Sequence, residues 1–187
     1  MNEFSLIDKY FNWGESELVE LGVGDDCAII NSDINQQLVT SVDTLIEGVH
    51  FSKNTPASDI AYKALAVNLS DLAAMGAVPK FFTLALTLPK LDEPWLEAFS
   101  TSLQLLAKKY NIDLIGGDTT KGHLSITINV TGGVKQGEAL LRSSAQADDV
   151  IFVSNTIGDA ALAWWQLNNG QTPSKALLSQ LNTPEPQ

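Results

Sequence analysis

Apolar and polar residues alternate along several stretches of the chain, and in other stretches the apolar residues recur every three or four positions. Alternation is typical of a half-buried strand, whereas the longer spacing is typical of a helix with one buried side. The pattern predicts strands at 25–31, 38–44, 81–88, 112–117 and 124–132, and helices at 57–75 and 93–110. We therefore expect an α/β fold in which a mixed sheet packs on the two helices.

The strand at 81–88 and the helix at 57–75 have the most regular patterns. The predicted buried side of the strand carries Phe82, Leu84, Leu86 and Leu88. The helix is apolar around most of its circumference, which predicts burial, with Ser58 or Asp59 as its N-cap. Asp71 lies inside this apolar pattern, so we expect its carboxylate to have a partner.

A polar run at 142–149 separates these elements from a further predicted strand, DDVIFV, and a helix that follows Gly158. We therefore predict a first domain at 1–145 and the beginning of a second domain at 146–187. A single strand and helix bury their apolar faces poorly, which favours a second domain that this chain leaves incomplete.

Composition and charge narrow the classes of partner. Of the 187 residues, 44% are hydrophobic and 18% charged, and the net charge is −11. An acidic chain lacks the basic surface that nucleic-acid binding requires. No apolar run approaches the ~20 residues that span a bilayer, and the N-terminus lacks the pattern of a signal peptide. Cys27 is the only cysteine, which favours a reducing cytoplasm, and we expect it to be a small buried side chain.

Acidic residues gather early in the chain, where no Lys or Arg lies between Lys9 and Lys53. Glu15, Glu17 and Glu20 fit the solvated side of a short helix. Other acidic motifs are predicted at the ends of elements: GVGDD (22–26), SVD (41–43), NLSDLAAMG (68–76) and GGDTT (116–120). Carboxylates without nearby lysines suit Mg²⁺, which binds hard oxygen ligands together with phosphate.

Each motif also has a purely structural interpretation. Gly-Asp pairs are common in turns, so GVGDD and GGDTT are weak signals when taken singly. Asp71 fits a capping or ion-paired aspartate, His50 a packed or exposed histidine, and Arg142 a surface charge. Neither a Walker A loop nor a kinase glycine-rich loop is present.

Taken in order and with their spacing, several segments resemble the thiamine-monophosphate kinases, a family of the ATP-using aminoimidazole ribonucleotide synthetase-like superfamily. The segments are GVGDDCAI, SVDTLIEGVHF, KALAVNLSDLAAMGAVP, LIGGDTTKG and IGDAALA. The resemblance covers roughly residues 3 to 187, and SVDTLIEGVHF and NLSDLAAMGA are its most specific parts.

The resemblance implies transfer of the γ-phosphoryl group of ATP to the phosphate of thiamine monophosphate, which gives thiamine diphosphate. By position, the implied magnesium ligands are Asp26, Ser41, Asp43, Asp71 and Asp118. Gly117 and Asp118 match the nucleotide-binding turn, Arg142 matches a contact to ATP phosphate, and His50 matches a residue near thiamine. The acceptor phosphate is already nucleophilic, so no protein base is needed. Asp25 is expected to support the turn.

The resemblance also implies a homodimer formed through the sheet of the first domain. Because the family's second domain completes the metal site and this chain lacks most of it, we expect the chain to be a fragment with little or no kinase activity. Two alternatives stay open. One is another ATP-using enzyme of the superfamily, cycloligase-like or selenophosphate synthetase-like, and the other is a non-catalytic module that binds nucleotide or metal and dimerises.

Overall fold

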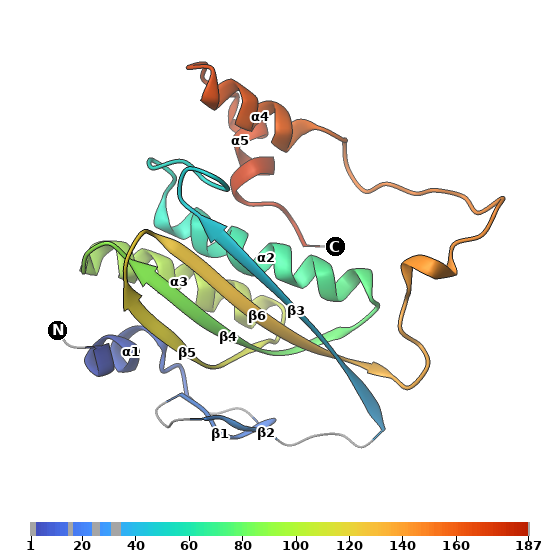
Figure 1. Cartoon of the computed structure of the whole chain (residues 1–187), viewed down its shortest axis with the longest axis horizontal. Coiled ribbons are helices and arrows are strands. Elements are labelled where there is room, and N and C mark those ends of the chain that lie inside the picture. Colours follow the sequence, from blue (N-terminus) through green and yellow to red (C-terminus); the bar gives the residue numbers. More distant parts are fainter. Residues whose placement is uncertain (1–2, 15–16, 24–26, 31–34, 187) are drawn as a thin grey trace.

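A four-stranded sheet forms the centre of the protein in a computed structural model that describes residues 3–14, 17–23, 27–30 and 35–186 (Figure 1). Its strands are β3 (Gln36–Ile46), β4 (Val78–Leu88), β5 (Asp113–Lys121) and β6 (Ser125–Lys135), in the order β3–β6–β4–β5. β6 is antiparallel to both of its neighbours, whereas β4 and β5 are parallel. The expected mixed sheet is confirmed.

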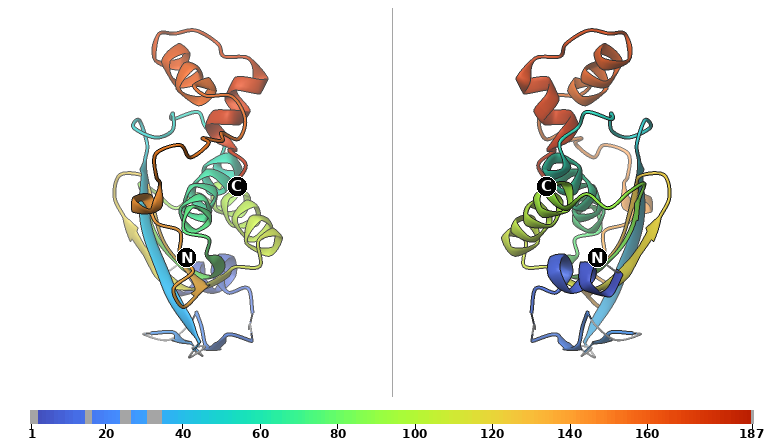
Figure 2. Two further views of the ribbon diagram at one scale, coloured as in Figure 1. Left: turned by 90° about the vertical axis from the view of Figure 1, so that its right-hand side faces the viewer. Right: turned by 90° about the vertical axis from the view of Figure 1, so that its left-hand side faces the viewer.

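Helices α2 (Ala57–Ala74) and α3 (Glu93–Lys109) cover one face of this sheet (Figure 2). The predicted apolar side of β4 is buried against them, with Phe82 0% and Leu86 1% exposed. The residues that alternate with these are less buried, and Ala85 is exposed on the opposite face. The period-two pattern therefore identified the buried side of the strand correctly.

The two helices begin differently. Asp92 caps α3, since its carboxylate accepts a hydrogen bond from the Trp95 backbone N–H at 3.2 Å. At α2 the predicted caps Ser58 and Asp59 are wrong, because the helix begins earlier and Pro56 occupies the N-cap without a side-chain hydrogen bond. The fixed φ of proline suits a helix start and explains why no polar cap is needed here.

The N-terminal part contains α1 (Glu3–Phe11) and a small antiparallel pair, β1 (Val19–Leu21) and β2 (Ile29–Ile30). Glu20 therefore lies in a strand and not in the expected helix, because Val19 and Leu21 pair with the two isoleucines. Of the strand predicted at 25–31, residues 27–30 are described, and Ile29–Ile30 form β2. Cys27 is exposed, which corrects the expectation of a buried thiol.

After β6 the chain passes through a short 3₁₀ turn, η1 (Arg142–Ser144), and reaches helices α4 (Asp159–Asn168) and α5 (Lys175–Asn182). The predicted strand DDVIFV does not form: Val150, Ile151, Phe152 and Val153 are 57–89% exposed. A strand needs a neighbouring strand to satisfy its backbone, and no described residue pairs with this segment. The domain boundary near 145 stays a prediction.

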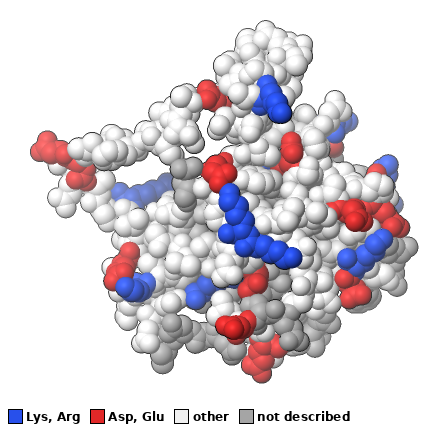
Figure 3. Space-filling view, turned by 180° about the vertical axis from the view of Figure 1, so that it is seen from behind, with Lys and Arg blue, Asp and Glu red and all other residues white. Residues whose placement is uncertain are grey.

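The sequence predicts neither a nucleic-acid-binding surface nor a membrane-spanning segment, and surface charge and helix length are the corresponding structural features. On the face shown in Figure 3, acidic and basic side chains are interspersed and form no broad basic patch. Within the described ranges, none of the helices has the length and apolar character needed to cross a membrane.

Candidate functional site

The shortest link between two of the predicted ligand residues joins β3 to α2. The Ser41 hydroxyl donates a hydrogen bond to Asp71 Oδ2 at 2.7 Å. The expectation that Asp71 has a partner is therefore confirmed, and its side chain is exposed although the helix around it is largely buried. Asp71 is exposed because β3 is an edge strand, so this side of α2 opens to solvent beyond it.

Because side chains alternate along β3, Asp43 lies on the same side of the strand as Ser41. Ser41, Asp43 and Leu45 fall on the same side of the strand, and Leu45 is buried at 6% exposure in the core under the helices. Asp43 therefore lies on the helix side, one alternate position from Ser41. Ser41 and Asp71 are in contact where β3 passes α2, and Asp43 is the next residue along β3 on the same side. This set of hard oxygen atoms suits Mg²⁺, which commonly binds one or two carboxylates together with phosphate.

β3 leads into a tight turn that carries His50. The backbone N–H of Ile46 donates to His50 Nδ1 at 3.0 Å, while the N–H of His50 donates to the Ile46 carbonyl at the same distance. Gly48 adopts a φ of 81°, which few other residues tolerate. Because Nδ1 accepts a hydrogen bond, the neutral imidazole carries its proton on Nε2.

Lys63 of α2 also stabilises the turn that carries His50. Its ammonium donates to the His50 carbonyl oxygen at 2.7 Å. Burial of this side chain lowers the pKa of Lys63 below its ordinary value. Sequence reasoning missed this residue. The available signal was a lysine within an apolar helix, eight positions before Asp71.

These contacts define a seam between β3 and α2, with Ser41 and Asp71 at one end and His50 and Lys63 at the other. The step of eight residues from Lys63 to Asp71 corresponds to about 12 Å along the helix axis. The Asp71 carboxylate and the turn that carries His50 are therefore about two helical turns apart.

Asp118 lies away from this seam. The sequence placed it at the end of a strand, but β5 continues through Lys121, because Thr119 and Thr120 pair with Leu86 and Thr87. The register sets Asp118 beside Ala85 of β4, on the face away from the helices. β5 is the opposite edge of the sheet from β3, so three strand spacings, about 14 Å, separate the two edges. The structure does not bring Asp118 to the other carboxylates.

Gly117 has a clear structural role in β5. A side chain at this position would collide with the Leu84 backbone carbonyl of β4. The close approach follows an irregularity in the pairing, where Phe82 is opposite Leu114 and Thr83 is opposite Gly116. A glycine is thus required here for strand packing, independently of any contact to nucleotide.

Arg142 lies in η1, after the end of β6, and the chain just before it contacts the Asp71 end of α2. Two residues before it, the backbone N–H of Leu140 donates to the Met75 carbonyl at 3.0 Å. Met75 follows α2 and lies one helical turn beyond Asp71. The exposed Arg142 therefore starts from the same end of α2 as the carboxylate.

The predicted metal cage is only partly assembled. Among the described residues, no three His, Cys, Asp or Glu side chains lie close enough together to hold a metal ion. Asp25 and Asp26 fall outside the described residues, so the predicted contribution of GVGDD is not seen. Ser41 and Asp71, which are in contact, and Asp43 on the same side of β3 offer the hard oxygen ligands that a magnesium ion takes together with phosphate and water.

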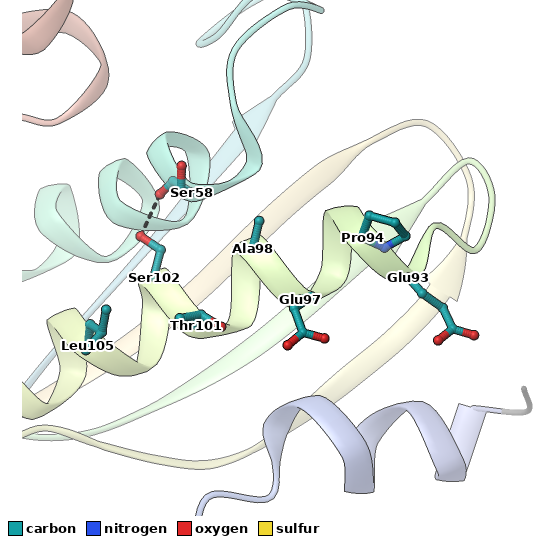
Figure 4. A pocket seen from close by; sticks show the side chains of 8 residues that line it. All are labelled: Ser58, Glu93, Pro94, Glu97, Ala98, Thr101, Ser102 and Leu105. Carbon is teal, nitrogen blue, oxygen red and sulfur yellow. Dashed lines mark hydrogen bonds between the residues drawn. The ribbon is translucent and has the colours of Figure 1, made fainter.

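A hollow with a volume of about 740 Å³ lies elsewhere, along α3 (Figure 4). The Ser102 hydroxyl donates to the Ser58 carbonyl at 2.7 Å across its rim. Glu93 and Glu97 point outward from α3 in the close-up. None of the predicted ligand residues lines this hollow, so it carries no part of the site.

Similarity to characterised proteins bears on what the seam does. The chain is 54% identical over 169 residues to the thiamine-monophosphate kinase of Salmonella typhimurium, covering 89% of this chain and 52% of that protein. It is similar to the crystal structure of thiamine-monophosphate kinase from Stenotrophomonas maltophilia K279a at 46% identity and a TM-score of 0.88, covering all of this chain and 62% of that one.

A third relative was solved with ligands. AaThiL complexed with AMPPCP and TMP is 28% identical with a TM-score of 0.75, covering 98% of this chain and 59% of that one. The chain thus spans about half the length of the curated relatives it matches.

The family assignment comes from a match that covers more than half of the chain. The model of the AIR synthase related protein, N-terminal domain, matches residues 24–134, which include β3, α2, β4, α3 and β5. The resemblance inferred from the sequence motifs is confirmed, and the chain belongs to the family of AIR synthase related proteins through this N-terminal domain.

Proposed function

We propose that this chain supplies the ATP-binding and magnesium-binding domain of a thiamine-monophosphate kinase, which transfers the γ-phosphoryl group of ATP to the phosphate of thiamine monophosphate. One observation carries the proposal: Ser41 of β3 and Asp71 of α2 meet at 2.7 Å, with Asp43 on the same side of β3. The identity of 54% to the Salmonella typhimurium kinase supports it.

In this proposal Ser41, Asp43 and Asp71 hold Mg²⁺ at one end of the seam, and Asp26 completes the set. When bound, Mg²⁺ neutralises charge on the phosphates, which is the main requirement of phosphoryl transfer. Arg142, which starts from the same end of α2, contacts ATP phosphate. Asp118 binds metal or nucleotide from the open face of the sheet, beyond the seam.

His50 serves the acceptor substrate at the other end of the seam. Its Nδ1 is occupied by the Ile46 N–H, so the free donor is Nε2–H, which suits a phosphate or hydroxyl oxygen. The phosphate of thiamine monophosphate is itself the nucleophile, so alignment is sufficient and no base is assigned.

The protein is further proposed to act in the cytoplasm as a homodimer. The sheet face away from α2 and α3 carries Leu38 and Val42 of β3, which are 58% and 57% exposed. None of the described helices packs on this face (Figure 2). An uncovered apolar strand face suits pairing with a second copy.

Calorimetric titration with Mg²⁺ and AMPPCP, a non-hydrolysable ATP analogue, tests the proposed site. Asp71→Asn should weaken magnesium-dependent binding at least tenfold, because the proposed metal site loses one of its negatively charged ligands. Asp113→Asn, on β5, is the matched control and should bind as the unaltered chain does. Equal affinities for the two variants would contradict the proposed ligand role.

An assay of thiamine diphosphate formation separates the proposed kinase from a module that only binds nucleotide. We expect this 187-residue chain to bind AMPPCP with little or no turnover. Binding without turnover that is restored by adding the second half of a relative would support the kinase, whereas no restoration would favour the non-catalytic module.

A further inference from the structure

The segment that follows α5 returns to the first domain and meets it through one carboxylate. Glu185 Oε1 accepts hydrogen bonds from Lys109 Nζ at 2.6 Å and from the Tyr110 hydroxyl at 3.1 Å. Its other oxygen, Oε2, accepts from the Tyr62 hydroxyl at 3.1 Å. Three donors from α2 and from the end of α3 therefore converge on a single acidic side chain.

The three donors also support one another. The Lys109 ammonium lies 4.9 Å from the centre of the Tyr110 ring, close enough for a cation–π contact. Tyr62 and Tyr110 are half-buried, and both pack against the hydrophobic core. Their hydroxyl groups are thus fixed in position, which reduces the entropy that a partner must overcome on binding.

Helix α5 also contacts α2, but the segment that leads to α4 adds no buried residue. Residues 141–157, which connect β6 to α4, are exposed throughout. A hollow of about 450 Å³ separates α5 from the turn before α2, with Pro56, Asp59 and Lys175 among its lining residues. Glu185 is followed by the buried Pro186, so the carboxylate contact is accompanied by apolar packing.

We propose that Tyr62, Lys109 and Tyr110 form a carboxylate-binding site on α2 and α3, and that its occupant is Glu185, which ties α4 and α5 to the first domain. An isolated exposed ion pair contributes little, because solvent screens it. Here the occupant belongs to the same chain and stays at a high effective concentration, so a modest contact is still mostly closed.

The contact should respond to pH in one direction. The hydrogen bond from Lys109, and then those from the two tyrosines, lower the pKa of Glu185. The contact of such a carboxylate is fully stabilising at pH values above the ordinary glutamate pKa. Its contribution to stability is lost as the pH falls through the lowered pKa and the carboxylate becomes protonated. Of the groups that face it, Lys109 has its pKa raised by the hydrogen bond to Glu185 and Tyr62 has its pKa raised by burial, so both stay protonated in that acidic range, while Tyr110 contributes its hydroxyl donor.

Hydrogen exchange of the full chain, followed by mass spectrometry, tests this site without any ligand. Lys109→Met should speed exchange in peptides covering 175–182 by about fivefold at neutral pH and low salt, the size expected for an ion pair at a partly exposed site. Peptides from the middle of α2 should be unchanged. Lys108→Met removes the neighbouring lysine of the same helix and is the matched control.

A second set of variants keeps the test valid if Lys109→Met disturbs α3. Glu185→Gln changes only the exposed occupant and should accelerate exchange of α5 to a similar extent. Exchanging the charges, Lys109→Glu with Glu185→Lys, should restore most of the protection. The proposal is overturned if Glu185→Gln leaves exchange at 175–182 as slow as in the unaltered chain, or if Lys108→Met has the same effect as Lys109→Met.

Discussion

Gly117 has two candidate roles, nucleotide binding and close packing of two strands, and the structure shows the basis of the second. The sequence motif assigns Gly117 to nucleotide binding, whereas the packing of β5 against the Leu84 carbonyl already requires a glycine. A residue can serve both purposes, but the structural requirement alone predicts a measurable effect on folding.

Gly117→Ala should lower the free energy of unfolding by about 2–4 kcal/mol, because the added methyl group forces β4 and β5 apart. Gly116→Ala is the matched control, since a side chain at Gly116 would meet nothing within 4 Å. Thermal unfolding measured without nucleotide reports the difference. If both variants melt at the same temperature, the close approach at Gly117 does not constrain the sheet.

A second prediction for a single residue concerns the tautomer of the His50 imidazole. The neutral imidazole should be protonated on Nε2, because Nδ1 accepts the Ile46 N–H at 3.0 Å. Long-range ¹H–¹⁵N correlation spectra distinguish the two tautomers. His123 is the only other histidine and provides an internal reference.

Lys63→Met should weaken the preference of His50 for the Nε2-protonated tautomer. The substitution removes the 2.7 Å hydrogen bond to the His50 carbonyl, and the turn becomes less fixed. Lys53→Met, a change in the residues after the turn, is the control. A His50 spectrum that does not change in Lys63→Met would show that the turn is held without the lysine.

At the scale of elements, exposure of the segment 150–153 makes it different from every strand of the sheet. Phe152 is 89% exposed, whereas Phe82 of β4 is 0% exposed. Both residues lie in apolar runs that look alike in sequence. The free energy of unfolding should therefore respond to the two positions very differently.

Phe82→Ala should cost about 3–5 kcal/mol, the usual loss for removing a buried aromatic ring. Phe152→Ala should change the unfolding free energy of this chain by less than about 0.5 kcal/mol. Urea unfolding followed by circular dichroism measures both. A large loss for Phe152→Ala would mean that segment 150–153 packs in solution in a way that the structure does not show.

These elements also show what sequence reasoning can and cannot supply. The period-two runs in β4 and β6 and the helical spacing in α2 and α3 were enough to predict the core, because each has one strongly apolar side. The extent of β5 was missed, since Gly116 and Gly117 resemble a turn and only pairing with β4 extends the strand. The placement of Asp118 on the far edge follows from strand order, which a single sequence does not encode.

For the whole molecule, the uncovered face of the sheet makes the oligomeric state the most accessible property to test. Val42 lies on this face at 57% exposure, and Val49 lies in the turn after β3 at the same exposure. The two valines differ in location and not in how much of each side chain is accessible.

Val42→Glu should convert the proposed homodimer to a monomer in sedimentation velocity, because it places a charge in an apolar interface. Val49→Glu should leave the sedimentation coefficient unchanged. A monomer for the unaltered chain at high concentration, or equal behaviour of the two variants, would count against a dimer formed through this face.

β3 carries two different surfaces on alternate residues. Ser41 and Asp43 face α2, while Leu38 and Val42 face outward from the sheet. Its pairing with β6 runs without interruption from Gln36 to Ile46. Insertion or deletion of one residue before Ser41 would therefore exchange the two sets, with the Asp43 carboxylate placed on the proposed subunit contact and valine placed beside Asp71. A single strand thus sets the register of both the proposed dimer surface and the proposed metal site, so one frame shift would disrupt both at once.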